Sequence, residues 1–300
     1  MSTRTCLAVS SIAFCLLSVP TAGRPLHAGG GSGVTDAGSA IRLLMRADDM
    51  GNSYGRTLGI IKAHKDGIIT STSIMATSQF FEESVRLCKQ NPKLAIGVHV
   101  TLFGTRTRPA LSPESIPSLV TPEGFFYEGS AEVKHEFNVK EMEREITAQV
   151  DKVKAAGLRV VYLDWHRSVS QAAIEIITRI CDERKLLFGQ ARNGSGYGHA
   201  RVPLMRETWP ALKTPDGQRV LYAAPSFSKE DREFFFNALS ALKPGKWIGV
   251  VHPGTGEPQR ASVVELLCSP RTKEIIKSKN IQLVSYNDLW DEIYGKTTSR

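Results

Sequence analysis

Residues 41–51 read IRLLMRADDMG, an apolar run that ends in two adjacent aspartates, Asp48 and Asp49. A short apolar run that stops at a turn signal is typical of a strand buried on both faces of a parallel sheet. Three further runs of this kind each carry an imidazole near the carboxyl end, at His99, His166 and His252. In parallel α/β folds, ligands bind at the carboxyl ends of the strands. The runs therefore predict a shared site at one edge of a sheet.

Strand-like and helix-like segments alternate from residue 41 onward, in roughly seven units. The clearest helix spans 139–156, where apolar residues recur at three- and four-residue spacing. Two long stretches, 103–138 and 193–227, interrupt the alternation and are typical of functional loops. This order predicts an α/β fold, specifically an irregular parallel (β/α) barrel of TIM-barrel-like form. A doubly wound open sheet is the alternative.

Three segments are expected along the chain. Residues 1–23 combine an early arginine, an apolar stretch and small residues for cleavage, which is typical of an export signal. A leader that is not cleaved, or a wrongly assigned start, is the alternative. Residues 24–40 are rich in Gly and Ser and indicate a flexible linker, and 41–293 form the predicted folded domain. The protein is therefore expected to be exported, as a periplasmic or secreted protein.

Charge and hydropathy restrict the partners. The chain has 300 residues and a formal net charge of +8, but its Lys and Arg are scattered. No basic run is interleaved with aromatic residues, so nucleic acid is not an expected partner. The stretch after the leader has no apolar segment long enough for membrane insertion. Attraction to an acidic glycan stays open, and a homodimer is one option for assembly.

Two interpretations of Asp48 and Asp49 stay open. At the end of a strand the backbone turns, so both carboxylates can address one cleft, where a metal takes one as a ligand and the other accepts a proton. Alternatively, one of the two caps the N-terminus of the following helix.

The three histidines also have competing interpretations. His99 and His166, with one carboxylate, make a plausible ligand set for a divalent cation, Zn²⁺ or Mg²⁺. Asp164 lies two residues before His166 and could orient an imidazole, or be an ordinary buried acid. His252 precedes the turn Pro253-Gly254 and could donate a proton to a leaving group or only stabilise the turn.

At this point the chain resembles a known family, the YdjC-like carbohydrate deacetylases, which include chitooligosaccharide deacetylases. No single motif is decisive, but their order and spacing are specific over about residues 41–290. The matching segments are 47–51 (ADDMG), 67–73 (GIITSTS), 97–102 (GVHVTL), 116–120 (IPSLV), 252–254 (HPG) and 283–286 (LVSY).

The resemblance implies a polysaccharide-deacetylase-like irregular barrel and a divalent metal held by Asp49, His99 and His166. It implies that Asp48 is the catalytic acid/base carboxylate and His252 a catalytic proton donor. One segment departs from the family pattern. After the retained His166 the family usually has further histidines, where this chain has Arg167 and Ser168.

The function expected from the resemblance is a metal-dependent hydrolase that removes N-acetyl groups from acetylated sugars or oligosaccharides. Trp165, Tyr197 and Trp209 are candidates for stacking on a sugar, with core packing as the alternative. A carbohydrate-binding descendant without catalysis, and a metal-dependent phosphoesterase, are the alternative functions.

Overall fold

The computed structural model describes residues 40–104, 107–128, 137–167, 169–189, 211–213, 219–221 and 226–295. The described residues belong to one compact unit, Gly38–Arg300. The predicted leader and nearly all of the predicted linker lie outside the described residues.

A parallel sheet forms the centre of this unit, and each strand predicted next to a site residue is present. The sheet order is β5-β4-β3-β2-β1-β8, and β9 pairs with the first half of β1. Every pairing within it is parallel. The strands are β1 (Ile41–Met50), β2 (Ser71–Ile74), β3 (Ala95–Val100), β4 (Val160–Trp165), β5 (Leu187–Phe188), β8 (Gly245–Val251) and β9 (Ile281–Val284).

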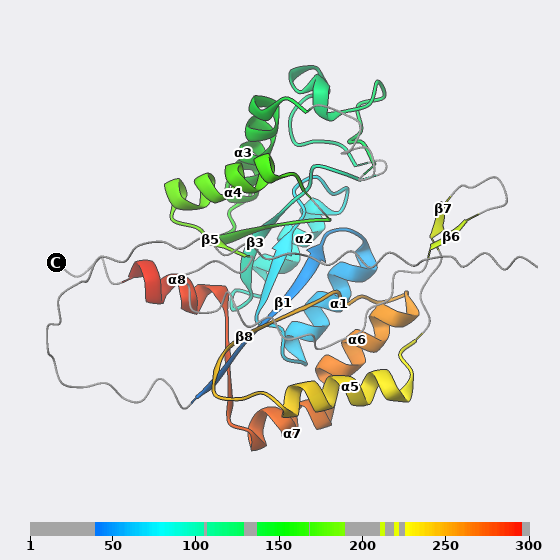
Figure 1. The fold of residues 1–300 in the computed structure, drawn as a ribbon, viewed down its shortest axis with the longest axis vertical. Helices are drawn as coiled ribbons and strands as arrows, with labels where there is room; N and C mark the ends of the chain where they lie inside the picture. Colours follow the sequence, from blue (N-terminus) through cyan, green and yellow to red (C-terminus); the bar gives the residue numbers. More distant parts are fainter. Residues whose placement is uncertain are drawn as a thin grey trace, which may run out of the picture. The chain divides into compact units, whose positions relative to one another are not determined.

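Helices follow the strands in the predicted order (Figure 1). Ser53 and Ser228 cap α1 and α5 by accepting hydrogen bonds from backbone amides of the first turn. A break at Pro270 separates α6 from α7, and Ser269 caps the second of these. The helices are α1 (Tyr54–Lys65), α2 (Phe81–Lys89), α3 (Val139–Ala155), α4 (Gln171–Arg184), α5 (Lys229–Ser240), α6 (Pro258–Cys268), α7 (Pro270–Ser278) and α8 (Tyr286–Tyr294).

Strand β1 is buried on both faces, and its two faces pack into different apolar clusters. Leu43, Met45 and Ala47 belong to the large apolar cluster that also contains helix residues. Leu44 belongs to a second, smaller cluster with residues of β4, β8 and α8. Because side chains alternate along a strand, Arg46 and Asp48 share the face of Leu44. The polar end of this inner face is therefore where the site is built.

The sheet curls around that inner face. Arg46 of β1 and Tyr286 of α8 both donate hydrogen bonds to the carbonyl oxygen of Gly189, directly after β5. In a flat sheet, β1 and β5 would lie about 19 Å apart, four strand spacings. An arginine side chain cannot bridge that distance, so the sheet has to bend. The prediction of an irregular (β/α) barrel is confirmed, in the form of a curled parallel sheet.

The loop after β3 was predicted to be irregular, and it is tied to α3 by buried polar side chains. Gln149 holds the backbone N–H and C=O of Thr101 at 2.9 Å and 2.7 Å. Glu145 accepts hydrogen bonds from the backbone N–H groups of Ala110 and Leu111. The described part of the loop also contains two short 3₁₀ turns, η1 (Pro113–Ser115) and η2 (Pro117–Leu119). The loop is therefore held in place by α3 at Thr101, directly after β3.

The prediction that residues 193–227 form one long loop is wrong in one respect. Two short antiparallel strands lie within it, β6 (Ala211–Lys213) and β7 (Arg219–Leu221). The sequence between them, TPDGQ, contains a Pro-Asp-Gly turn signal that favours a hairpin. Among the described helices, none is long and apolar enough to cross a bilayer.

Candidate metal centre and active site

Two adjacent carboxylates at the end of β1 face different neighbours. Asp48 is 6% exposed and Asp49 is 3% exposed. Asp49 has a φ of 72°, in the left-handed region, so its side chain departs from the strict alternation of the strand. Neither aspartate caps α1, because Ser53 fills that position. The helix-cap interpretation is therefore wrong for both residues.

Asp49 lies between the two histidines predicted to be ligands. Its Oδ1 atom is 3.3 Å from Nε2 of His99, on β3, and 3.7 Å from Nε2 of His166, directly after β4. The imidazole ring centres are 5.5 Å apart. Three strands thus bring one carboxylate oxygen and two imidazole nitrogens together, as the sequence predicted that they would be.

The second oxygen of Asp49 faces arginines that the sequence analysis missed. Nη1 of Arg56, on α1, is 2.9 Å from Asp49 Oδ2, and Nη2 of Arg260, on α6, is 3.9 Å from it. Glu257 pairs with both arginines. The carboxylate is therefore oriented with Oδ1 toward the imidazoles. The spacing Glu257-x-x-Arg260 at a helix start was a weak signal for this arrangement.

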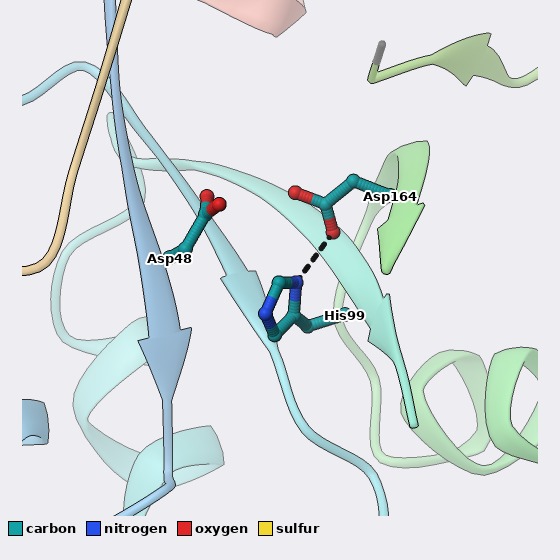
Figure 2. Close-up of side chains that lie close together, drawn as sticks. All are labelled: Asp48, His99 and Asp164. Carbon is teal, nitrogen blue, oxygen red and sulfur yellow. Dashed lines mark hydrogen bonds and ion pairs between the residues drawn. The ribbon is translucent and has the colours of Figure 1, made fainter. Parts of the chain in front are cut away.

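A second acidic cluster shares His99. Figure 2 shows Asp48, His99 and Asp164 turned toward one another from β1, β3 and β4. Potential ligand atoms of these three residues lie within 4.8 Å of one another. Nδ1 of His99 is 2.9 Å from Oδ1 of Asp164, and Ser73 donates to the other oxygen of Asp164. Asp164 therefore orients an imidazole, that of His99 on the neighbouring strand.

Two sets of residues could thus hold a cation, and their chemistry separates them. Both oxygens of Asp48 accept hydrogen bonds from Arg46, at 2.7 Å and 3.1 Å, and Arg46 also pairs with Asp164. One buried guanidinium therefore compensates part of the negative charge of that cluster and engages both oxygens of Asp48. The set of Asp49, His99 and His166 keeps one oxygen and two imidazole nitrogens directed at one another. A histidine ligand held through its other nitrogen by a carboxylate is a common arrangement in metal sites.

The protonation of the two histidines differs. Burial alone would raise the pKa of Asp49, but the hydrogen bond from His99 and the imidazoles of His252 and His166 keep it well below its usual range. Burial would lower the pKa of His99, but the carboxylates of Asp164, Asp49 and Asp48 raise it to about 10. Burial lowers the pKa of His166 to about 4, despite the nearby Asp49. At neutral pH, His99 is therefore charged and His166 is neutral.

His252 directly follows β8, at the same edge of the sheet as the other site residues. Its side chain is partly buried, and its carbonyl oxygen accepts a hydrogen bond of 2.9 Å from Nη1 of Arg260. Its imidazole contributes to the low pKa of Asp49, so it lies within electrostatic range of that carboxylate. The close approach of Gly59 to Gly254, where an added Cβ would lie 2.4 Å from the Gly254 Cα, fixes the turn after His252 against α1.

A cleft of about 910 Å³ opens beside His166. It runs along the loops after β2 and β3, and this volume lies within the range of sites that bind a small ligand. Three basic side chains and no carboxylate are among its described lining residues: Arg108, Lys152 and Arg167. Of the three aromatic candidates, Trp165 packs against the core near Phe188. Tyr197 and Trp209 lie outside the described residues.

Comparisons with known proteins show similarity to one family over most of the chain. The profile of the YdjC-like protein family matches residues 42–278. A carbohydrate deacetylase of Brevibacillus brevis is 28% identical over 264 residues, which is 83% of this chain and 100% of that protein. A carbohydrate deacetylase of Enterococcus faecalis is also 28% identical, over 83% of this chain and 98% of that protein.

A solved structure is similar over the same region. An Enterococcus faecalis protein, described provisionally as a cellobiose-phosphate cleavage protein, superimposes with a TM-score of 0.64 and 25% identity. The match covers 84% of this chain and 99% of that one. Because the family profile spans most of the sequence and the fold matches, the chain belongs to the YdjC-like family.

Proposed function

We propose that this protein is a metal-dependent hydrolase that removes N-acetyl groups from acetylated amino sugars or oligosaccharides. The observation that carries the proposal is the position of Asp49 Oδ1 between Nε2 of His99 and Nε2 of His166, at 3.3 Å and 3.7 Å. The names of the curated relatives, carbohydrate deacetylases at 28% identity, support the choice of reaction.

The donor set fits a divalent cation, zinc or magnesium, because one carboxylate oxygen and two imidazoles are ligands for such ions. A cation held by Asp49, His99 and His166 would supply Lewis-acid polarisation of the acetamide carbonyl. The fixed Nδ1 contact of His99 with Asp164 directs its Nε2 atom into the site.

The chain's own residues supply the proton transfers. Asp48 accepts a proton from the attacking water. This role of general base requires its carboxylate to lie close to the reacting atoms. His252, at the end of β8, donates a proton to the departing amine of the sugar. Backbone and side-chain donors around the cleft then stabilise the developing negative charge on the carbonyl oxygen. The cleft beside His166 provides the space for the sugar.

The test is acetate release by the purified protein from a panel of N-acetylated sugars, before and after treatment with a chelator. We expect acetate release that is lost on chelation and restored by Zn²⁺ or Mg²⁺. Metal analysis of the purified chain identifies the ion. Acetate release that survives complete removal of metal would contradict the proposal.

A second function is favoured by one observation. Arg167, which stands where the family usually has histidine, lines the cleft and has a strained φ of 62°. A carbohydrate-binding protein without catalysis is therefore the alternative. Binding of the same sugars without acetate release would support it, and hydrolysis of p-nitrophenyl phosphate alone would favour a phosphoesterase instead.

Metal binding is expected to release about one proton at pH near 7. His99 has a pKa of about 10, and its Nε2 atom, which faces Asp49, has to lose its proton before it can bind a cation. His166, with a pKa of about 4, is already neutral and releases none. Apparent metal affinity should therefore rise about tenfold per pH unit toward pH 10.

Calorimetric titration in buffers of different ionisation enthalpy counts the released protons. The same raised pKa has a consequence for the protein without metal. Charged His99 stabilises the fold fully below its ordinary pKa of 6.5, and this contribution is lost as the pH rises through about 10. Binding without proton release near pH 7 would contradict this account of His99.

We also propose that the protein is exported, since the segment 1–23 has the pattern of a signal peptide. N-terminal sequencing of the protein recovered from its source cells tests this proposal. A mature chain that still begins at Met1 would argue against it.

A further inference from the structure

Arg46 is a buried cation in the middle of β1. It is 2% exposed and lies two residues before Asp48, on the same face of β1. Its Nε and Nη2 atoms donate to Oδ1 and Oδ2 of Asp48 at 2.7 Å and 3.1 Å. Both oxygens of the proposed base are therefore held by one planar fork, the geometry in which arginine fixes a carboxylate most precisely.

The same guanidinium reaches the partner of His99. Nε of Arg46 is 3.2 Å from Oδ2 of Asp164, whose other oxygen contacts His99. The remaining nitrogen, Nη1, donates to the carbonyl oxygen of Gly189 and lies 3.4 Å from the Tyr286 hydroxyl. Arg46 is thus anchored on the far side of the curled sheet and joins two carboxylates of the site.

The surroundings of Arg46 are shaped to admit it. A Cβ at Gly189 would lie 3.0 Å from Nη1 of Arg46 and 2.8 Å from Cβ of Asp164. The fold therefore keeps a residue without a side chain where the guanidinium passes. Stability alone does not require this arrangement, because a buried ion pair is often no more stable than an apolar pair of similar volume.

We propose that Arg46 is a positioning residue for the reaction: its fork holds the Asp48 carboxylate in the orientation needed to take a proton from water, and its contact with Asp164 couples this orientation to His99. Arg46 acts through these two carboxylates and is not among the described residues that line the cleft. This inference rests on the proposed deacetylase function.

The test compares Arg46→Gln and Arg46→Lys with the wild type, each alone and combined with Asp48→Asn. We expect kcat for acetate release to fall about 10²-fold in Arg46→Gln, with KM within about threefold of the wild type, because the base is misplaced while the cleft is intact. Arg46→Lys, which keeps the charge but not the fork, should recover part of the loss. In the Asp48→Asn background, most of the effect of either change should disappear, because only the contact of Arg46 with Asp164 is then left to be lost.

The matched control is Arg42→Gln. Arg42 lies on the same strand and also pairs with both oxygens of a carboxylate, Glu292, but at the protein surface. Its substitution should leave kcat unchanged. Metal content should stay close to the wild-type level in all Arg46 variants, since Arg46 contacts none of Asp49, His99 and His166 in the part of the chain that is described, and Ser73 still donates to the Asp164 carboxylate that orients His99.

The outcomes are distinguishable. Additive losses of kcat in the double variants would show a general structural role and overturn the proposal. If the wild type is active and the Arg46 variants are equally active, the role of Arg46 is rejected and the proposed function stands. If the wild type is inactive, both are rejected. If Arg46→Gln does not fold, as judged by circular dichroism, Arg46→Lys carries the same comparison with Asp48→Asn.

Discussion

Replacing Asp48 with asparagine is expected to lower kcat for acetate release by about 10³-fold, within the range for loss of a general base. The asparagine side chain has the shape of the carboxylate but cannot take a proton from water. Arg46 can still donate one hydrogen bond to the amide oxygen, whereas the amide NH2 group cannot accept the second, so folding has to be checked beside activity. Acetate release under saturating substrate is the measurement, with folding checked by thermal unfolding.

The control for this variant is Asp66→Asn. Asp66 is the C-cap residue of α1, and its carboxylate is exposed. Among the ion pairs of the described residues, it pairs only with Lys62. The substitution should leave kcat unchanged. If Asp48→Asn released acetate almost as fast as the wild type, Asp48 would not be the general base of the reaction.

The alternation of strands and helices was predictable from the sequence because it depends on local patterns. The run 41–47 is apolar apart from Arg42 and Arg46, as expected for a strand that is largely buried on both faces. The helix 139–156 has apolar residues at helical spacing, and the structure has α3 within one residue of it. The hairpin β6–β7 was missed because strands of three residues carry too few side chains to show a period.

The convergence of an aspartate at the end of β1 with His99 and His166 was predictable because parallel strands end at one edge, and the choice of Asp49 came from the resemblance to the family. Their finer arrangement was not. Asp164 was considered as a partner for an imidazole, and the β3–β4 register, in which His99 lies opposite Asp164, decides that this is His99. Neither residue reveals the register of its strand from its own sequence.

The role of Arg46 could not be predicted for a related reason. In the sequence it is one of two arginines in a largely apolar run, which indicates only that a buried charge there must be compensated. The compensating groups come from β1, β4, the residue after β5, and α8. Only the curl of the sheet brings these segments together, and curl depends on packing over the whole domain.

The neighbouring variant Asp49→Asn should lower the affinity for metal, whereas Asp48→Asn should leave it unchanged. We expect the dissociation constant for Zn²⁺ to rise at least about 100-fold, more than the loss usually seen for residues that only support a ligand. The reason is the loss of the one negative charge between the Nε2 atoms of His99 and His166. Asp48→Asn should bind metal as the wild type does.

Asparagine is the appropriate substitution at residue 49 because the backbone there has a φ of 72°, and Asn and Asp are the side chains that best tolerate this region. A loss of metal can then be assigned to the carboxylate rather than to a changed turn. Calorimetric titration and the metal-to-protein ratio after dialysis measure the two variants side by side. If Asp48→Asn lost the metal and Asp49→Asn kept it, the cation would belong to the cluster of Asp48, His99 and Asp164. In that case Asp48 would be a ligand, and the base of the reaction would have to be sought elsewhere at the same edge of the sheet.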